Sequence, residues 1–511
     1  MKIFGLVVVV SLTFCFACSP ISERKQPIPS LEELAALDLK LNGEKLAVAY
    51  CGSCHLKPEP EILDKSTWQS KVLPDMRKRL GLYLPEDMNA PMPADMGIPD
   101  GIYSSYPLIK KEDWDKIQSY YLEKAPDKPL PQENKAIPNE GIPGFEIVQP
   151  SFEKINSNLT TMLRFKPGTN ELWLGHRYKS LFILDVPTNF KIKDSVATDV
   201  APIDIEWNSE GTFDLLTMGL MDPSADTVGV LTRFYNGEKT VLVDKLIRPV
   251  DVTYADLNGD GVEDQVISSF GDHIGKLSLF LSTGAAPQEV VLKDQAGARR
   301  TIALDFDGDG NLDVMGLMTQ GQEGIYVWLN EGGGIFKETR LLRFHPAYGA
   351  SDFRYEDMNG DGSKDIILVN GDNADLSQVL KRYHGVRIFL NNGNGGFEES
   401  WFYSMYGASG LEVGDFDGDG DLDIFAISFF PDPNQSPRQD LVYFRQEEKM
   451  KFESFVPKLD LDVRWMTLTS GDADNDGDLD VVVGSFDFRD LYGSDQHPWR
   501  PFIYLKNLQK N

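Results

Sequence analysis

Short apolar runs at regular intervals dominate the hydropathy pattern of the C-terminal two thirds of the chain. QVISSF, VMGLM, IILVN, IFAISFF and VVVGSF each follow an acidic turn. Runs of this length, rich in β-branched and aromatic residues and bounded by Gly, Asp and Asn, predict buried β-strands. This part of the chain is therefore expected to be all-β.

The acidic turns are copies of one repeat. Five segments with the pattern D-x-[DN]-x-D-G-x-x-D begin at Asp256, Asp305, Asp357, Asp415 and Asp472, at spacings of 49, 52, 58 and 57 residues. EWNSEGTFD at 206–214 keeps the register with fewer acids, and RFKPGTNELWLG from Arg164 keeps only the turn and the strand. A period near 50 with about four short strands per unit is typical of β-propeller blades. Seven units fit residues 144–511.

The last unit lacks a strand. Strands are expected near Trp465–Ser470, Leu479–Ser485 and Phe502–Leu508, after which the sequence ends. Because an unpaired sheet edge promotes aggregation, another segment is needed there. We predict that GFEIVQP, Gly144–Pro150, supplies the missing strand and closes the ring.

The N-terminal third has a different pattern. Lys2 precedes an apolar run over Ile3–Ala17, which is short for a membrane span and suits a secretory signal. Helical periodicity begins near Ser30 and returns as an amphipathic helix over Lys110–Lys124, before a Pro-rich run. The predicted organisation is a signal with a lipoprotein-type end over 1–18, a tether over 19–29, an all-α domain over 30–127, a Pro-rich linker over 128–143 and the propeller over 144–511.

Residues Cys51–His55 read CGSCH. C-x-x-C-H is the pattern of covalent haem attachment, in which two thiols bond the haem and the histidine is an axial ligand. A thioredoxin-like pair or half a zinc site would need a βαβ setting or a second C-x-x-C, and the sequence shows neither. We therefore expect one covalent haem c on Cys51, Cys54 and His55 in a small all-α cytochrome c domain. Gly43 would let the first and last helices of that domain cross closely.

The other two of the four cysteines, Cys15 and Cys18, lie in the signal, which leaves none for a disulfide. The end of the signal, CFAC, resembles a bacterial lipoprotein processing box, with Ala17 before Cys18. That resemblance implies lipidation of Cys18; ordinary cleavage and an uncleaved anchor are the alternatives. The protein is expected to be exported and membrane-anchored, facing the periplasm or the cell surface. Its formal charge of -29 argues against binding nucleic acid.

Each acidic repeat offers side-chain oxygens at positions 1, 3, 5 and 9 and a glycine at position 6. Hard oxygen donors at this density predict calcium, with the backbone carbonyl of position 7 as a further ligand. An EF-hand would need flanking helices and a glutamate at position 12, whereas strands follow here. About five calcium ions are expected, and the predicted side-chain ligands are Asp256, Asn258, Asp260, Asp264, Asp305, Asp307, Asp309, Asp313, Asp357, Asn359, Asp361, Asp365, Asp415, Asp417, Asp419, Asp423, Asp472, Asp474, Asp476 and Asp480.

On these motifs the chain resembles the FG-GAP or VCBS repeat family, whose best-known relative is the integrin α-subunit propeller. The resemblance implies that the calcium loop joins the first two strands of each blade and that the loops between the second and third strands emerge on the opposite face. Loops that carry polar and aromatic side chains on a rigid scaffold often bind ligands. We expect this second face to recognise a redox partner protein or a glycan through Asp372, Asn373, Asp375, Tyr383, His384, Asp495 and His497.

The sixth haem ligand has several candidates, since Met76, Met88, Met92 and Met96 all follow the motif. A methionine before proline in an irregular loop, the general cytochrome pattern, favours Met92. WQSKVLPDMRKRLG, from Trp68, resembles the segment that follows the haem motif in bacterial lipoproteins joining a cytochrome c domain to FG-GAP repeats, which implies Met76. Met76 is our prediction, with Met92 as the alternative.

Three functions follow from these features. The first is a membrane-tethered electron carrier whose calcium-stabilised propeller docks its partner. The second is an oxidoreductase with substrate at the propeller face, although propeller quinoproteins have eight blades and a tryptophan-based repeat. The third is a surface binding or adhesion module with an accessory haem. The first is favoured, because no catalytic constellation is readable in the loops.

Overall fold

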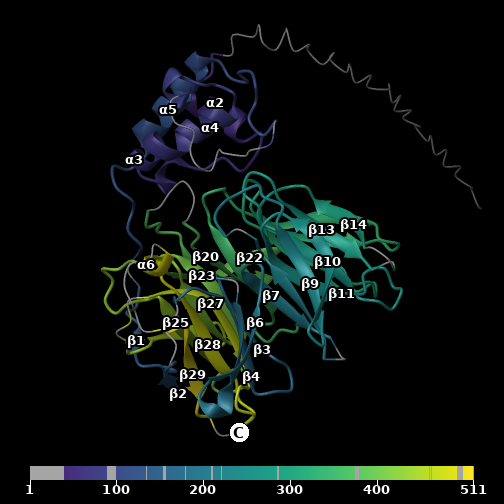
Figure 1. The fold of residues 1–511 in the computed structure, drawn as a ribbon. Helices are drawn as coiled ribbons and strands as arrows, with labels where there is room; N and C mark the ends of the chain where they lie inside the picture. Colours follow the sequence, from purple (N-terminus) through teal and green to yellow (C-terminus); the bar gives the residue numbers. More distant parts are fainter. Residues whose placement is uncertain are drawn as a thin grey trace, which may run out of the picture. The chain divides into compact units, whose positions relative to one another are not determined.

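The computed structural model describes residues 40–509 except 89–98, 100, 134, 153–156, 179, 209–210, 220, 283, 285–286, 374–378, 460, 462 and 492–498. Contacts separate Met1–Leu41 from Asn42–Asn511, and the fold below is that of the second unit (Figure 1). Within the described ranges, no helix combines the length and the apolar character needed to cross a bilayer.

Short helices make up the N-terminal part of this unit. Asn42 caps the first of them, its side-chain oxygen accepting the Lys45 N–H at 3.0 Å. The helices are α2 (Gly43–Cys51), α3 (Lys65–Thr67), α4 (Leu73–Arg79) and α5 (Lys111–Lys124), with a π-helical turn at Trp68–Val72 and 3-10 turns at Pro60–Ile62 and Pro85–Met88. Trp114, Ile117 and Tyr121 of α5 are buried at helical spacing, which confirms the amphipathic pattern predicted there.

Helices α2 and α5 cross at Gly43. A Cβ atom at this position would lie 2.1 Å from the Lys116 carbonyl oxygen and 2.7 Å from the Tyr120 Cβ. Only a residue without a side chain allows such an approach. The close crossing predicted for Gly43 is confirmed.

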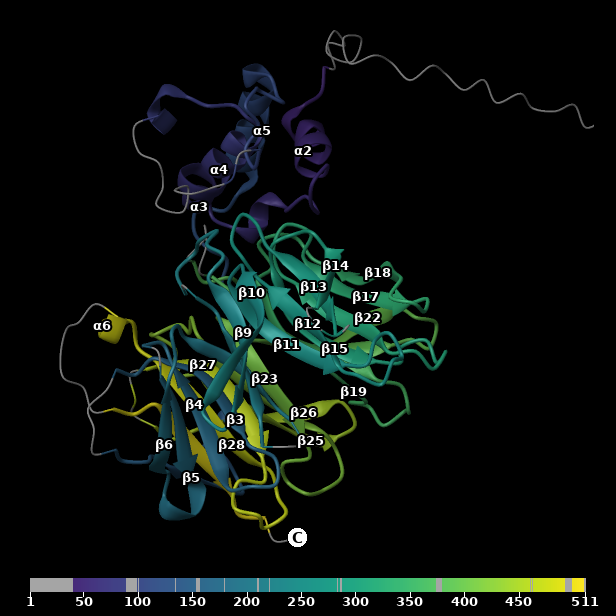
Figure 2. The same ribbon diagram turned by 45° about the vertical axis from the view of Figure 1, so that its right-hand side comes forward.

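The remainder is a seven-bladed β-propeller, as predicted (Figures 1 and 2). Blade 1 contains β3 (Thr160–Phe165), β4 (Glu171–His176), β5 (Ser180–Asp185) and β6 (Lys191–Ala197). Blade 2 contains β7 (Pro202–Trp207), β8 (Phe213–Thr217), β9 (Gly229–Tyr235) and β10 (Glu238–Leu246). Blade 3 contains β11 (Pro249–Ala255), β12 (Asp264–Ser269), β13 (Lys276–Leu281) and β14 (Gln288–Lys293). Blades 4 and 5 contain β15 (Ala298–Leu304), β16 (Asp313–Met318), β17 (Gly324–Asn330) and β18 (Phe336–Arg343); and β19 (Ala350–Glu356), β20 (Asp365–Asn370), β21 (Gly385–Asn391) and β22 (Phe397–Ser404).

Blades 6 and 7 incorporate strands from before the ring. Blade 6 contains β23 (Ala408–Gly414), β24 (Asp423–Ser428), β25 (Leu441–Glu448) and β26 (Lys451–Val456), with β1 (Asn139–Glu140) added parallel to β26. Blade 7 contains β27 (Arg464–Gly471), β28 (Asp480–Phe486), β29 (Phe502–Asn507) and β2 (Phe145–Val148), and the short helix α6 (Phe488–Leu491) follows β28.

The ring closes as the sequence predicts. β2 pairs antiparallel with β29, with Phe145 opposite Asn507 and Val148 opposite Tyr504. Blade 7 also bonds directly to blade 1, because the Thr160 hydroxyl donates to the Pro501 carbonyl at 2.7 Å. The unpaired edge expected after Phe502–Leu508 is therefore covered.

The segment predicted as a linker over 128–143 differs in part from a free spacer. Its residues Asn139 and Glu140 pair with Phe455 and Val456, and the Gly141 N–H donates to the Val456 carbonyl at 2.8 Å. A two-residue strand is too short to leave a hydropathy pattern, which is why the sequence does not reveal it.

The apolar runs form the second strand of each blade. All six residues of β12, β16, β20 and β24 are buried, whereas the outer strands β14 and β18 have no buried position. The hydrophobic core lies between blades: Val266 of blade 3 and Val314 of blade 4, for example, belong to one cluster. Burial on both faces explains why these strands read as continuous apolar runs.

Candidate functional sites

The CGSCH motif lies where α2 ends. Cys51 is the last residue of the helix, and the following turn is held by the His55 N–H donating to the Cys51 carbonyl at 3.4 Å and the Ser53 hydroxyl donating to the Tyr50 carbonyl at 2.7 Å. Both Cys51 and Cys54 are free thiols, the first partly buried and the second exposed. The two thiols and the imidazole therefore come from a single turn of backbone.

The His55 ring is arranged as a metal ligand would be. Its Nδ1 lies 3.0 Å from the Leu56 carbonyl oxygen. A proton on Nδ1 donates to that carbonyl and leaves the Nε2 lone pair free, which is the usual arrangement for a ligating histidine. Burial lowers the pKa of His55 and so favours the neutral ring that can bind a metal.

Of the two methionines predicted as the second axial ligand, only Met76 lies within the described residues. Met76 lies in α4 and is half-buried, with its backbone carbonyl accepting the Leu80 N–H at 3.1 Å. Met92 lies outside the described residues, as does Cys18. The choice between Met76 and Met92 stays a prediction.

The five acidic repeats fold into the same loop, and each joins the first two strands of its blade. In every copy the N–H of the position-6 glycine donates to the first aspartate, as from Gly261 to Asp256 at 2.9 Å and from Gly310 to Asp305 at 3.1 Å. These glycines have positive φ, 84° at Gly261 and 98° at Gly477. The turn shared by the five repeats therefore requires glycine for its backbone conformation.

Carboxylates converge in these loops. Oxygen atoms lie within 4.8 Å of one another in three clusters, Asp305 with Asp307 and Asp313, Asp415 with Asp417 and Asp419, and Asp472 with Asp474 and Asp480. The other two repeats have asparagine at position 3, and there the buried Asn359 Oδ1 has no hydrogen-bond partner. Gathered acid groups and an unpartnered buried oxygen are the chemistry that a hard cation would satisfy.

The aspartate at position 9 has a structural role in addition. Asp264, Asp313, Asp365, Asp423 and Asp480 are all buried. Asp313 shows the arrangement: Oδ2 accepts the Phe306 N–H at 2.8 Å, and Oδ1 accepts the Asn330 N–H at 2.7 Å. Burial raises the pKa of Asp423 to about 7 and that of Asp480 to about 6. These carboxylates hold the loop against its own blade. Burial makes their ionised form less favourable, and a neighbouring cation would offset this effect.

Sequence reasoning missed a set of amide side chains that link four of the five acidic loops to the next blade. Asn330 Nδ2 donates to the Leu257 carbonyl at 2.8 Å, across the boundary between blades 4 and 3. Asn507 does the same to Phe416 at 2.8 Å, Gln446 to Met358 at 3.4 Å and Asn170 to Ala473 at 3.2 Å. The accepting carbonyl is always at position 2 of the acidic loop. Asn330, Gln446 and Asn507 lie near the end of the third strand of their blades, whereas Asn170 lies directly before the second strand of blade 1.

The degenerate repeat at 206–214 is balanced by a protein cation. Asp214, its position-9 residue, is fully buried and accepts two hydrogen bonds from Arg233, both at 2.7 Å, and one from the Tyr254 hydroxyl at 2.8 Å. The arginine supplies the positive charge that the buried carboxylate needs. This agrees with leaving that loop out of the calcium count.

Two of the residues predicted for the binding face, Tyr383 and His384, make contacts inside the propeller. His384 is only 1% exposed, and the Tyr383 hydroxyl donates to the Ala347 carbonyl at 2.8 Å. Burial holds the pKa of His384 well below its usual range. Asp372 lies in the same loop, whereas Asp375, Asp495 and His497 lie outside the described residues. Tyr383 and His384 pack under this face, so in this conformation they position its loop.

Comparisons with known proteins agree with the repeat architecture. The FG-GAP-like repeat family matches residues 305–368 and 369–426, which include three of the five acidic loops. The chain thus contains FG-GAP-like repeats built into a seven-bladed β-propeller. One solved structure with similarity is that of S. cerevisiae Dbp5 (a variant) bound to Nup159, a Gle1 variant, IP6 and ADP; the alignment has 10% identity and a TM-score of 0.42, and covers 73% of this chain and 97% of that one. No curated protein matches the chain.

Proposed function

We propose that this protein is a membrane-tethered, extracytoplasmic electron-transfer protein that carries one covalent haem c beside a calcium-stabilised propeller. The observation that carries the proposal is the CGSCH turn, where two free thiols and an imidazole with its Nδ1 held by a backbone carbonyl follow one helix. A covalently bound haem supplies one-electron transfer within a protein.

The residues present fit that group. Cys51 and Cys54 would form the thioether bonds, and His55 would bind the iron through Nε2. The Gly43 crossing packs the first residue of α2 against α5, and Cys51 is the last residue of the same helix. The Leu56 carbonyl holds the His55 ring in the tautomer that ligation requires.

Calcium is proposed for the five acidic loops. The converging carboxylates of the Asp305, Asp415 and Asp472 loops and the unpartnered Asn359 oxygen support this assignment. Because each loop connects two strands of a blade and touches the next blade, bound cations would stabilise the propeller. The loops of the opposite face are proposed to dock a redox partner protein.

Tethering is proposed through lipidated Cys18, on the strength of the signal-like run and the CFAC end. The anchor would hold the haem and the propeller on the outer side of a membrane. There the haem would exchange electrons with a partner that the propeller binds.

Optical redox titration of the purified protein tests the electron-transfer proposal. We expect a c-type spectrum that interconverts reversibly between reduced and oxidised forms. The absence of a redox-active chromophore in protein produced with haem-attachment machinery would refute it. Met76→Ala and Met92→Ala, compared in the same titration, identify the axial methionine as the variant that loses the low-spin spectrum and lowers the potential.

A further inference from the structure

The described linker residues before β1 and the loops of blade 6 line a partly open cavity that presents several polar side chains. It has a volume of about 280 Å³ and is lined by Pro131, Gln132, Glu133, Lys135, Ala136 and Ile137 from the linker and by Tyr406, Gln435, Ser436 and Gln439 from the propeller. The pairing of β1 with β26 fixes one end of the linker, and the Gln132 N–H donates to the Tyr406 hydroxyl at 3.3 Å at the other. The cavity is therefore a built feature of the ring.

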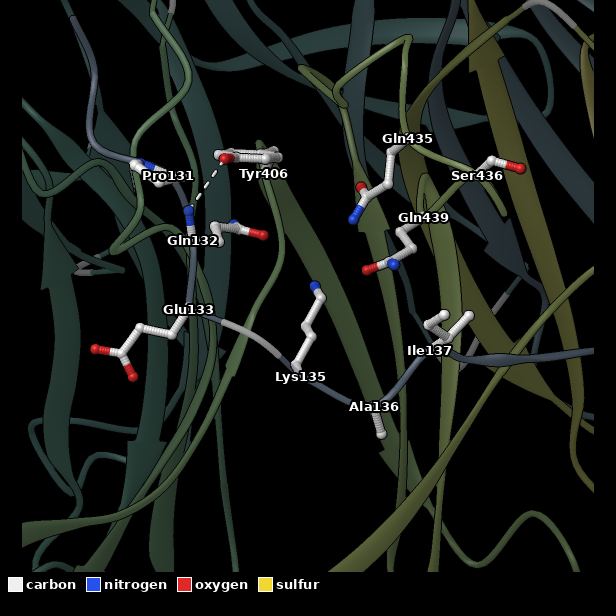
Figure 3. Close-up of a pocket in the computed structure, with 10 residues that line it drawn as sticks. All are labelled: Pro131, Gln132, Glu133, Lys135, Ala136, Ile137, Tyr406, Gln435, Ser436 and Gln439. Atoms are coloured by element: carbon white, nitrogen blue, oxygen red, sulfur yellow. Dashed lines mark hydrogen bonds between the residues drawn. The ribbon is translucent and has the colours of Figure 1, made fainter.

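A lysine occupies its centre. Figure 3 shows Lys135 extending into the space between Gln132 and Tyr406 on one side and Gln435 and Gln439 on the other, while Glu133 points away. Lys135 Nζ donates to the Ser404 carbonyl and lies 4.2 Å from the centroid of the Tyr403 ring. Among the described residues, no carboxylate forms an ion pair with it. Burial alone lowers the pKa of Lys135 to about 7.

Other donors around the lysine are also available. The Gln132 Nε2 is buried without a hydrogen-bond partner. Gln439 is 6% exposed, and its Oε1 accepts from the Tyr403 hydroxyl at 3.2 Å, which fixes the direction of its amide. A buried donor without an acceptor and a cation without an anion both cost free energy.

We propose that this cavity binds a small hydroxylated carboxylate of the size of a sugar acid. The carboxylate would accept from the Lys135 ammonium and the Gln132 amide, and so give the cation an anionic partner and the Gln132 amide an acceptor. Amide side chains both donate and accept, so Gln435 and Gln439 suit the hydroxyl groups of such a molecule. A cavity of about 280 Å³ approaches the lower end of the range usual for small-molecule sites.

Isothermal titration calorimetry on the purified full-length protein tests the proposal, with D-glucuronate, D-galacturonate and D-gluconate as probes and D-glucose as the neutral comparison. We expect at least one acid to bind and glucose not to bind. Lys135→Met keeps most of the side-chain volume and should weaken binding by about tenfold or more. Gln132→Glu replaces the donor by a like charge and should have the same effect, while Lys128→Met, in the exposed part of the linker, should have none.

The pH dependence supplies a second readout. Glu133, Tyr403 and Tyr406 are the other titratable groups around Lys135, and burial raises the pKa of both tyrosines, so the phenols stay neutral near pH 7. Affinity should therefore fall as the pH rises from 6 to 9 and the ammonium is lost. No binding of any acid, equal binding of glucose, or unchanged affinity in both Lys135→Met and Gln132→Glu would overturn the proposal. Thermal unfolding of each variant shows whether the ring is intact.

Discussion

Single side chains at the blade boundaries hold the acidic loops in place. Asn330 is 5% exposed, and its amide donates to the carbonyls of Leu257 at 2.8 Å and Leu312 at 3.0 Å. One residue thus joins the loop of its own blade to the loop of the preceding blade. A similar amide recurs at Gln446 and Asn507.

Replacing this amide should destabilise the propeller. Asn330→Ala leaves two buried carbonyls without donors, and we expect a loss of about 2–3 kcal/mol in the free energy of unfolding. Urea denaturation monitored by tryptophan fluorescence measures it. Asn394→Ala, an exposed asparagine in a hairpin turn of blade 5, serves as the control and should change stability little. Equal effects of the two substitutions would show that the bridge contributes nothing.

Gly43 has a comparable role in the helical part. Gly43→Val places a side chain against the Lys116 carbonyl, so α2 and α5 must separate, at a cost of about 1–3 kcal/mol or more. Hydrogen exchange should become faster in both helices and stay unchanged in the blades. Val48→Ala, at a position 55% exposed in α2, is the matched control. Unaltered exchange in Gly43→Val would contradict the close crossing.

At the scale of elements, the acidic loops are the units whose stability depends on their charge. The Asp305, Asp415 and Asp472 loops bring carboxylate oxygens within 4.8 Å of one another, and the position-6 glycine of each has a positive φ. Mutual repulsion in such a loop is relieved when a divalent cation binds. The CGSCH turn, by contrast, contains no carboxylate.

Chelation should therefore separate the two parts experimentally. Excess EDTA is expected to lower the melting temperature of the propeller by about 10 °C or more, while the haem absorbance stays nearly unchanged. Asp307→Asn should reduce the measured calcium content, whereas Asp294→Asn, an exposed aspartate outside the loops, should not. A melting temperature insensitive to chelator would argue that the loops function without metal.

The elements also show what can be predicted from sequence. The number of blades and the positions of the acidic loops could be predicted from the acidic repeats and the apolar runs, because each residue of these patterns has a local role in its own turn or strand. The amide bridges were not predictable, since Asn330 and Leu257 are 73 residues apart and meet only when blades are adjacent. β1 and the Lys135 cavity could not be predicted for a related reason, because two paired residues and a single lysine leave no periodic pattern in the sequence.

At the scale of the whole molecule, closure depends on residues that precede the ring. Phe145 of β2 lies 5.3 Å from Phe425 and 5.8 Å from Tyr443 of blade 6, measured between ring centroids. The closing strand β2 therefore both completes the sheet of blade 7 and packs against blade 6. Closure joins the two ends of the propeller segment, so it should contribute to the stability of every blade.

Phe145→Ala tests this coupling. Loss of a half-buried aromatic contact should lower the free energy of unfolding by about 2 kcal/mol. Urea denaturation, with Ile335→Ala at a position 62% exposed as the control, measures the difference. If Phe145→Ala changed stability no more than the control, closure by β2 would be energetically unimportant.

The proposed electron transfer depends on the CGSCH turn. Intact-mass spectrometry under denaturing conditions, on protein produced with haem-attachment machinery, tests it most directly. We predict one covalently attached haem per chain, and the Cys18→Ser variant should retain it. In Cys51→Ala and in Cys54→Ala, attachment through two thioether bonds should be lost. A wild-type chain with the mass of the polypeptide alone, or haem retained when both thiols are replaced, would contradict the account.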